Sequence, residues 1–464
     1  MSPEAGRAGG RRREARDPVS APVAALTGLA FGGLRFARPP RSGDATRRID
    51  AGGPTRAASM RLPVQRGPRG VTLRWLPLVA AAAFLLAGCE TMSTWFPQLS
   101  AIPPPWQWFS FGGSKKMPPL PPFDAKTTPR VNWQVALGGK EVTGFAPVVQ
   151  RDNVVAAGPD GSIVSVGTAN GAQNWRFRTE RPISAGVGSA GNLVVVGTDK
   201  ADVLAFDAGG KSLWQARISS EVAGPPVVAE GLAIAWSLDG KIFALAGADG
   251  STKWVYQRTN PPLTVRRVAG GVVSRGGLFT GTAGGKLLAL DLATGALGWE
   301  ASVATPKGAT ELERIADVTS LPVVEERQVC AAAYQGRVAC FEIVRGTLIW
   351  SRDFSSLAGL TVDNRYLFLT DDKGAVHALD KTTGVSVWKQ DKLAGRFPSG
   401  PVLVGDYLGV VDAEGYLHLL DRNDGALVGR VATDGAAAES QPATNGAAAI
   451  WQSSAGNLIS ASAN

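Results

Sequence analysis

The sequence has few of the residues that most catalytic and metal sites need. Its 464 residues include two histidines and three cysteines. From Cys89 onward it contains no HxxxH, CxxC or GxSxG motif and no phosphate-binding P-loop. His377 and His418 occupy the same strand position in two repeats, "AVHALD" and "YLHLLD", which indicates structural roles rather than a pair of metal ligands. We therefore expect no enzyme activity, no catalytic residue, no cofactor and no metal.

The sequence also lacks an excess of charge once its N-terminal part is set aside. Of 48 basic and 39 acidic residues, 15 arginines and 5 acidic residues lie in residues 1–88, which leaves 33 basic and 34 acidic residues from Cys89 onward. The net charge of +9 thus falls to −1. Because a protein that binds nucleic acid normally carries a basic excess, we expect no nucleic acid partner.

Glycine, by contrast, is abundant and stands on a repeating frame. Two glycine turns lie ten residues apart and a tryptophan follows the second glycine by four positions, as in "DGKIFALAGADGSTKW" with Gly240, Gly250 and Trp254. The same frame recurs at Gly161, Gly171 and Trp175, at Gly285, Gly295 and Trp299, at Gly336, Gly346 and Trp350, and at Gly374, Gly384 and Trp388. Two repeats are imperfect: before Gly210 and Trp214 the first turn reads "DKAD", and after Gly415 and Gly425 the tryptophan position holds Gly429.

Each repeat predicts a small antiparallel sheet. The X-Gly pairs supply the positive φ angles that two-residue hairpin turns need, and the runs between them, such as "KIFAL" and "YLHLL", are rich in apolar strand formers. The tryptophans recur at intervals of 38 to 51 residues, a period that is typical of propellers and arrays.

The two ends of the repeat region predict that the sheets form a closed ring. The last repeat, "IWQSSAGNLISASAN", ends at Asn464 one strand short, whereas Trp133 in "RVNWQVAL" lies in a last strand with no repeat before it. Pairing these ends removes free sheet edges. We therefore predict an all-β fold over residues 129–464: an eight-bladed β-propeller of four-stranded antiparallel blades, closed by N- and C-terminal strands in one blade.

Cys330 and Cys340 flank the turn at Gln335-Gly336. An odd-numbered loop centred on Gln335 would place the two cysteines opposite each other and permit a disulfide, whereas a two-residue turn would put them on opposite faces as buried thiols. The sequence leaves both alternatives open.

Three segments precede the ring. Residues 1–59 are rich in Arg, Gly, Ala and Pro without periodicity, and we expect them to be untranslated, with the true start at Met60 or Val71, or else a disordered basic tail. Residues 60–88 have the pattern of a secretory signal, with four arginines before a twelve-residue apolar run from Trp75 to Leu86. Residues 89–128 are rich in proline and indicate an extended tether.

The signal ends in Leu86-Ala87-Gly88-Cys89, which resembles a bacterial lipobox. The resemblance implies that the chain is cut before Cys89 and that this cysteine carries acyl chains, several of which together anchor a protein durably. Glu90 follows in place of the aspartate associated with inner-membrane retention, so the resemblance favours the outer membrane, with the protein facing the periplasm. The alternative is an ordinary cleaved signal with a chance cysteine.

The lipobox, the tether and the eight blades together resemble the BamB family, lipoprotein subunits of the outer-membrane β-barrel assembly (BAM) machinery, over residues 74–464. The most specific local matches are "PPLTVRR" at 261–267, "ATELERIADVTSLPVV" at 309–324 and "GDYLGVVDAEGYLHLLD" at 405–421. The resemblance implies a scaffold that docks on the periplasmic domains of the barrel insertase BamA, contacts other subunits and helps unfolded outer-membrane proteins reach them. By motif it assigns partner binding to Leu263, Val265 and Arg266 in the first stretch and Asp317 in the second. Where the family commonly has a second acidic residue, this chain has Thr319.

The spacing of the repeats points to the same two stretches. The intervals from Trp254 to Trp299 and from Trp299 to Trp350 are the longest, so insertions lie on consecutive blades, and loops on a rigid scaffold often carry function. The alternative is that the charges of these loops are solvated and pair with one another. Two other functions remain open: a lipoprotein that binds a glycan or another envelope ligand, and a dehydrogenase dependent on pyrroloquinoline quinone (PQQ). The blades resemble the repeats of such dehydrogenases, but the adjacent cysteine pair of those enzymes is missing.

Overall fold

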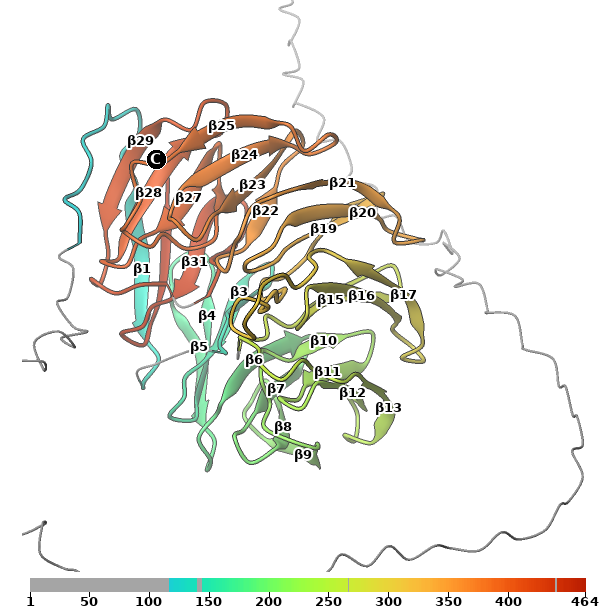
Figure 1. Cartoon of the computed structure of the whole chain (residues 1–464). Coiled ribbons are helices and arrows are strands. Elements are labelled where there is room, and N and C mark those ends of the chain that lie inside the picture. The colour runs from blue at the N-terminus through green and yellow to red at the C-terminus, as the bar shows by residue number, and fades with distance from the viewer. Residues whose placement is uncertain (1–116, 140–143, 266, 439) are drawn as a thin grey trace, which may run out of the picture. The chain divides into compact units, whose positions relative to one another are not determined.

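The computed structural model describes residues 117–464 except 140–143, 266 and 439. In these residues all regular structure is β-strand, arranged as eight four-stranded antiparallel sheets in a ring (Figure 1). The predicted eight-bladed propeller is therefore confirmed. The predicted signal and Cys89 lie outside the described residues.

The strands are assigned to blades as follows. Blade 1 comprises β2 (Val148–Val149), β3 (Asn153–Ala157), β4 (Ser162–Gly167) and β5 (Gln173–Arg178). Blade 2 comprises β6 (Ala185–Ala190), β7 (Leu193–Gly197), β8 (Asp202–Asp207) and β9 (Ser212–Arg217). Blade 3 comprises β10 (Val227–Ala229), β11 (Leu232–Trp236), β12 (Lys241–Ala246) and β13 (Thr252–Gln257). Blade 4 comprises β14 (Gly271–Ser274), β15 (Gly277–Thr282), β16 (Lys286–Asp291) and β17 (Leu297–Ser302).

The second half of the ring repeats the same order. Blade 5 comprises β18 (Val323–Val324), β19 (Gln328–Ala332), β20 (Val338–Glu342) and β21 (Leu348–Arg352). Blade 6 comprises β22 (Leu360–Val362), β23 (Tyr366–Thr370), β24 (Val376–Asp380) and β25 (Ser386–Gln390). Blade 7 comprises β26 (Val402–Val404), β27 (Tyr407–Val411), β28 (Tyr416–Asp421) and β29 (Leu427–Ala432). Blade 8 comprises β30 (Ala443–Thr444), β31 (Ala448–Gln452), β32 (Asn457–Ser462) and, from the N-terminal side, β1 (Arg130–Ala136).

Blade 8 closes the ring. Its outer strand β1 pairs antiparallel with β32, with Trp133 opposite Ser460 and Ala136 opposite Asn457. Figure 1 shows β1, in cyan, within the blade whose other strands are red. The innermost strands β30 and β2 of blades 8 and 1 also contact each other. The predicted closure by terminal strands is therefore confirmed.

Consecutive blades are joined by a glycine of one blade against an aromatic ring of the blade before it. A Cβ atom on Gly250 would lie 2.6 Å from the Trp214 ring, and the same close approach joins Gly384 to Trp350. The indole Nε1 of Trp214 donates a hydrogen bond to Gly247 O at 2.8 Å, in the same turn as Gly250. At one junction the contact differs: Gly210 lies against Phe177 rather than Trp175. The core therefore lies between the blades, in apolar clusters that each join neighbouring sheets.

The missing tryptophan at Gly429 follows from the way the ring closes. A tryptophan there would need the turn between the third and fourth strands of the next blade to pack against, but in blade 8 these strands, β32 and β1, are the two ends of the ring. The N-terminal strap, residues 121–129, lies there instead. Lys126 N–H and Thr127 N–H donate to Val428 O at 2.8 and 3.2 Å, and a Cβ on Gly429 would meet Pro129 at 2.9 Å. The strap includes residues that the sequence assigns to the tether, so the end of that segment is packed on blade 7.

The prediction of two-residue hairpin turns is wrong. In the first turn of blade 3, Ser237 N–H donates to Lys241 O at 2.9 Å, which encloses three residues. Gly240 has φ +87°, so one left-handed residue per turn suffices instead of the two that a two-residue type I′ turn requires. The second turn encloses four residues, since Ala246 N–H donates to Ser251 O at 2.8 Å. Where the first turn lacks its glycine, Ala201 takes the left-handed conformation, with φ +66°.

The odd-numbered loop also decides between the alternatives for the cysteines. The loop of blade 5 is centred on Gln335, so Cys330 on β19 lies opposite Cys340 on β20. Their Cα atoms are 4.0 Å apart and the two sulfurs are bonded as a disulfide. The bridge is buried in the cluster that joins blades 5 and 6.

Candidate partner-binding face

One side of the ring carries the loops that join consecutive blades. Because strands alternate in direction, each loop from an outer strand to the next inner strand lies on the same side as the three-residue turns. We call this side the loop face. Its longest loops are residues 258–270, between β13 and β14, and residues 303–322, between β17 and β18. These are the two inserted stretches that the repeat spacing predicts.

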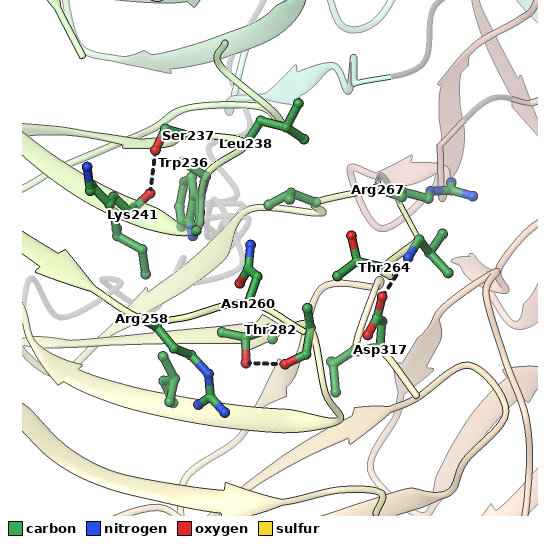
Figure 2. A pocket seen from close by; sticks show the side chains of 18 of the residues that line it. Trp236, Ser237, Leu238, Lys241, Arg258, Asn260, Thr264, Arg267, Thr282 and Asp317 are labelled. Carbon is green, nitrogen blue, oxygen red and sulfur yellow. Dashed lines mark hydrogen bonds between the residues drawn. The ribbon is translucent and has the colours of Figure 1, made fainter. Parts of the chain in front are cut away.

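Asp317 fixes the first inserted loop from within the second. Its side chain is only 2 % exposed. Oδ2 accepts a hydrogen bond from Val265 N–H at 2.7 Å (Figure 2). Oδ1 accepts one from Gly284 N–H at 2.8 Å. Both carboxylate oxygens are thus used inside the protein. Asp317 therefore positions the loop that carries Val265 rather than presenting a charge at the surface, and Thr319 is buried as well.

The other predicted partner-binding residues lie on residues 258–270. Leu263 is 43 % exposed, a high value for a leucine, while Val265 is half-buried. Arg266 lies outside the described residues. The structure thus brings Val265 and Asp317 into direct contact and leaves Leu263 at the surface.

A cavity of about 70 Å³ lies behind this loop, between blades 3 and 4. Its lining includes Trp236, Arg258, Thr264, Val265 and Asp317 (Figure 2). It is much smaller than the roughly 300–1,000 Å³ of ordinary ligand pockets. The cavity therefore has the size of a packing gap under the loop, not of a cofactor pocket.

The charges beside this cavity are paired. Arg258 and Lys286 both contact the carboxylate of Glu300, at 2.5 and 3.3 Å. Burial raises the pKa of the neighbouring Tyr256 above its ordinary value, with Glu300 adding to the effect and Arg258 opposing it. These contacts tie the start of the loop to blade 4.

The second inserted loop carries charges that are satisfied locally. Glu313 accepts hydrogen bonds from Ala309 N–H at 2.7 Å and Thr310 N–H at 3.2 Å. Hydrogen bonds from these backbone groups, that of Thr310 first, lower the pKa of Glu313. Glu311 pairs with Arg314 at 3.3 Å, so the alternative that loop charges pair with one another holds here. Leu312, between these charges, is 67 % exposed.

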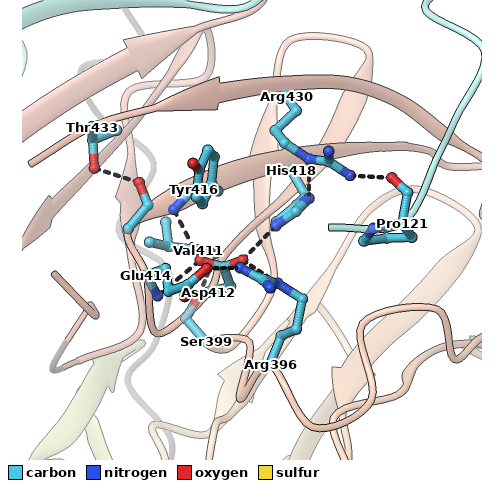
Figure 3. A network of polar contacts seen from close by, with 11 residues as sticks. Pro121, Arg396, Ser399, Val411, Asp412, Glu414, Tyr416, His418, Arg430 and Thr433 are labelled. Atoms are coloured by element: carbon cyan, nitrogen blue, oxygen red, sulfur yellow. Dashed lines mark hydrogen bonds and ion pairs between the residues drawn. The ribbon is translucent and has the colours of Figure 1, made fainter. Parts of the chain in front are cut away.

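A buried polar network holds blade 7 and the N-terminal strap together (Figure 3). Arg430 Nε donates to His418 Nδ1 at 3.2 Å, and the other ring nitrogen, Nε2, lies 2.9 Å from Asp412 Oδ2. Because a guanidinium only donates, Nδ1 must accept, and the proton of the neutral ring is on Nε2. Arg430 also donates to Pro121 O at 2.7 Å, on the strap. The histidine is thus a neutral link between an aspartate and an arginine.

The network sets the protonation states of its members. Burial lowers the pKa of His418, and the positive charges of Arg430 and Arg396 add to the effect against the opposing pull of Asp412. Burial acts to raise the pKa of Asp412, but hydrogen bonds from His418, Tyr416 N–H and Arg396 outweigh it and bring the pKa below its ordinary value. In the next blade back, His377 Nε2 lies 2.8 Å from Asp371 Oδ2. Each histidine thus pairs with an aspartate of its own blade, in the structural role that the sequence predicts.

Among the described residues, no group of three or more His, Cys, Asp or Glu side chains is placed to hold a metal ion. None of the described segments forms a helix long and apolar enough to cross a membrane.

Sequence reasoning missed three features of this face. The first is the burial of Asp317, because burial of a loop residue leaves no periodic signal. Leu312 was visible as an apolar residue within "TELER" but was not singled out. Phe397, which is 72 % exposed in a blade-joining loop of ordinary length, has no signal in the repeat pattern.

The chain is similar to proteins of one family. A family model described as outer membrane protein assembly factor BamB matches residues 159–390 and 373–464. The outer membrane protein assembly factor BamB of Nitrosomonas eutropha is 45% identical over 304 residues, which cover 65% of this chain and 74% of the relative. That of Bordetella pertussis is 40% identical over 336 residues, which cover 72% of this chain and 87% of the relative.

Solved structures agree with this similarity. The crystal structure of BamB from Moraxella catarrhalis matches with a TM-score of 0.66 and 26% identity, covering 72% of this chain and 100% of that one. A quinohemoprotein alcohol dehydrogenase from Comamonas testosteroni matches with a TM-score of 0.57 but 13% identity, covering 73% and 78% of the two chains. The second likeness is one of fold alone.

Proposed function

The chain belongs to the BamB family of outer membrane protein assembly factors, and we propose that it acts as a scaffold subunit of the BAM machinery by docking on a folded partner through its loop face. It is a non-catalytic subunit. The partner we propose is the periplasmic part of the barrel insertase BamA, and the docking residues are Leu263, Val265 and Arg266. Asp317 supports them from inside.

The observation that carries this proposal is an exposed leucine on a loop fixed by a buried carboxylate. A surface loop normally loses conformational entropy when it binds, and a loop held in advance loses less. The two hydrogen bonds from Val265 and Gly284 to Asp317 supply this preorganisation. Arginine is enriched among the residues that dominate binding energies, which favours Arg266, and the exposed Leu263 offers apolar surface that docking would bury.

A titration of the purified full chain with the periplasmic domains of the barrel insertase tests the proposal. Leu263→Asp and Arg266→Glu should each weaken binding by about 2 kcal/mol, roughly thirtyfold, with unchanged circular dichroism. Leu213→Asp is the matched control, because Leu213 is 45 % exposed but lies on the outer strand β9 instead of the loop face. Wild-type affinity in both loop variants would rule out this docking surface.

We further propose that Cys89 is lipidated and holds the protein on the outer membrane, facing the periplasm. The lipobox-like sequence before it supports this, together with a family whose name places its members in outer membrane protein assembly. Cys89→Ser should abolish palmitate labelling and release the protein from membranes. Unchanged labelling would exclude this anchor.

A further inference from the structure

Phe397 departs from two ordinary rules of residue choice. It is the most exposed of the large apolar side chains in the described part of the chain. Its backbone has φ +51°, in the left-handed region that a bulky residue occupies only at a cost in free energy. Glycine or asparagine would fill this position with less strain and less exposed apolar surface. Positions where the residue type conflicts with its local surroundings are expected at functional sites.

The residue before Phe397 is held rigidly. Arg396 is 1 % exposed, and its guanidinium contacts Asp412 Oδ2 at 2.7 Å and Glu414 Oε2 at 2.6 Å (Figure 3). Its backbone N–H donates to Leu393 O at 3.0 Å, and its carbonyl accepts from Ala413 N–H at 3.0 Å. Arg396 is therefore a positioning residue for the loop.

The residues after Phe397 are fixed as well. Ser399 N–H donates to Val411 O at 2.8 Å, and Ser399 O accepts from Thr370 Oγ1 at 2.8 Å. Pro398 packs closely enough on Gly374 that a Cβ there would lie 3.1 Å from its ring. With both flanks fixed, the backbone of Phe397 has no freedom to leave the left-handed region, and the ring is directed outward in advance of any contact.

The position of Phe397 on the ring relates it to the proposed docking surface. Its loop joins β25 to β26 and therefore lies on the loop face, the side that also exposes Leu263, Leu312 and Leu321. Single exposed apolar residues are ordinary on a protein surface. An exposed aromatic residue on a strained backbone that is fixed on both sides is not. Aromatic side chains have only two torsions to order on binding, and Phe is among the residues that are enriched at protein interfaces.

We propose that Phe397 is a preformed docking residue that inserts its ring into an apolar socket on a second folded protein of the same assembly. This inference rests on the proposed function, because it assigns the loop face to protein contacts. A protruding ring is buried well by a concave socket of a folded domain and poorly by an extended chain. Near the ring, Asp391 is paired with Lys389 and Glu414 with Arg396, so these four charges cancel, whereas faces that insert into membranes are rich in unpaired Lys and Arg. A protein socket therefore fits better than a lipid surface.

The test compares variants of the full-length lipoprotein in affinity isolation from solubilised envelopes. Phe397→Gly removes the ring and also relieves the left-handed strain, so it should raise the melting temperature of the purified protein while it lowers recovery of at least one assembly subunit about tenfold. Phe397→Trp should retain that subunit. Val387→Gly is the control, because Val387 is an exposed apolar residue on the outer strand β25. If Phe397 had only a structural role, its removal would not raise the melting temperature and at the same time lower the recovery of a partner.

A photocrosslinking side chain at position 397 identifies what the ring touches. Crosslinks to a folded subunit of the assembly support the proposal. Crosslinks only to lipid, only to unfolded client chains, or to nothing would overturn it, as would full recovery of every subunit by Phe397→Gly. If the wild type recovers the barrel insertase and Leu263→Asp does not, the proposed function stands and the outcome at Phe397 is judged alone. If the wild type recovers no assembly subunit, both ideas fail together.

Discussion

Trp254 of blade 3 and Gly295 of blade 4 lie in direct contact. A Cβ atom on Gly295 would come within 2.6 Å of the Trp254 ring, and the indole Nε1 donates to Leu292 O of the same turn at 2.9 Å. The glycine and the tryptophan that mark one repeat in the sequence therefore meet different neighbours. The glycine of a repeat contacts the tryptophan ring of the preceding blade, whereas the tryptophan of the same repeat contacts a glycine of the following blade. The frame is thus a rule for joining blades as much as for forming them.

The contact predicts that two glycines with the same backbone conformation tolerate alanine differently. Gly295 has φ +71° and Gly231 has φ +76°, but nothing lies within 4 Å of a Cβ at Gly231. Gly231→Ala should cost about 1 kcal/mol for the left-handed conformation alone. Gly295→Ala should cost a further ~1–3 kcal/mol for overpacking against Trp254. Unfolding in guanidinium measures both, and equal costs would show that the ring does not press on the turn.

The disulfide should contribute to stability by restricting the unfolded chain. Cys330 and Cys340 close a loop of about ten residues, for which the chain-entropy estimate is roughly 2–3 kcal/mol. Replacing both with alanine should lower the free energy of unfolding by about that amount, and reductant should have no further effect on the variant. The check is denaturant unfolding of both proteins with and without dithiothreitol. Two proteins with the same midpoint in every condition would mean that the bond contributes nothing.

Acid should destabilise the protein through the network around His418. The pKa of His418 is lowered in the folded state, so below about pH 6.5 the unfolded chain binds a proton that the folded chain refuses, and stability falls as the pH falls toward the folded pKa. The pKa of Asp412 is also lowered in the folded state. The stability that this ionised carboxylate contributes is therefore present above about pH 4 and is lost as the pH falls through the folded-state pKa.

Replacing His418 with glutamine separates these two effects. His418→Gln should flatten the fall in melting temperature that begins below about pH 6.5, while the loss below about pH 4 remains. Melting temperatures from pH 2 to 8 provide the comparison, with His377→Gln measured alongside. An identical pH profile in wild type and His418→Gln would contradict the role given to this histidine.

Removing Asp317 should weaken docking without removing a partner contact. Asp317→Ala leaves Val265 N–H and Gly284 N–H buried without their acceptor, at a cost of about 2 kcal/mol or more in stability. The loop then has to be ordered on binding, so affinity for the barrel insertase should fall together with stability. Glu311→Ala, on an exposed ion pair, should change stability by less than ~0.5 kcal/mol. If Asp317→Ala lost stability and kept full affinity, the loop would not need to be fixed in advance.

The repeats were predictable because the physical signals recur. Turn glycines, apolar strands and a periodic tryptophan gave the blade number, and the unpaired Trp133 gave the closure. The turn lengths were not predictable from the Asp-Gly pairs, because a three-residue turn and a two-residue turn can use the same pair and differ only in hydrogen bonding. Because turn length sets the strand register, the same uncertainty left open whether Cys330 and Cys340 lie opposite each other and form a disulfide.

The candidate site was predictable in place and not in detail. Insertions against a regular period show which loops are special, so residues 258–270 and 303–322 stood out. Whether a loop residue is buried depends on long-range contacts that leave no local pattern, as the hydrogen bond from Val265 to Asp317 across 52 residues shows. The left-handed conformation of Phe397 is imposed by Arg396 and Ser399 on either side, and their partners lie elsewhere in the chain.

The pairing of β1 with β32 has a consequence for the order in which the protein can form. Residues 130–136 meet residues 457–462, so among the described strands the one synthesised first waits for the one synthesised last. Seven blades can assemble as the chain emerges, each from strands that are adjacent in sequence, but the eighth forms only when β32 is available. Contacts of such long sequence separation form slowly and leave apolar edges unpaired in the meantime. A growing chain of this protein therefore carries an open seam at Trp133 until β32 has been made, and any truncation that removes β32 makes that seam permanent.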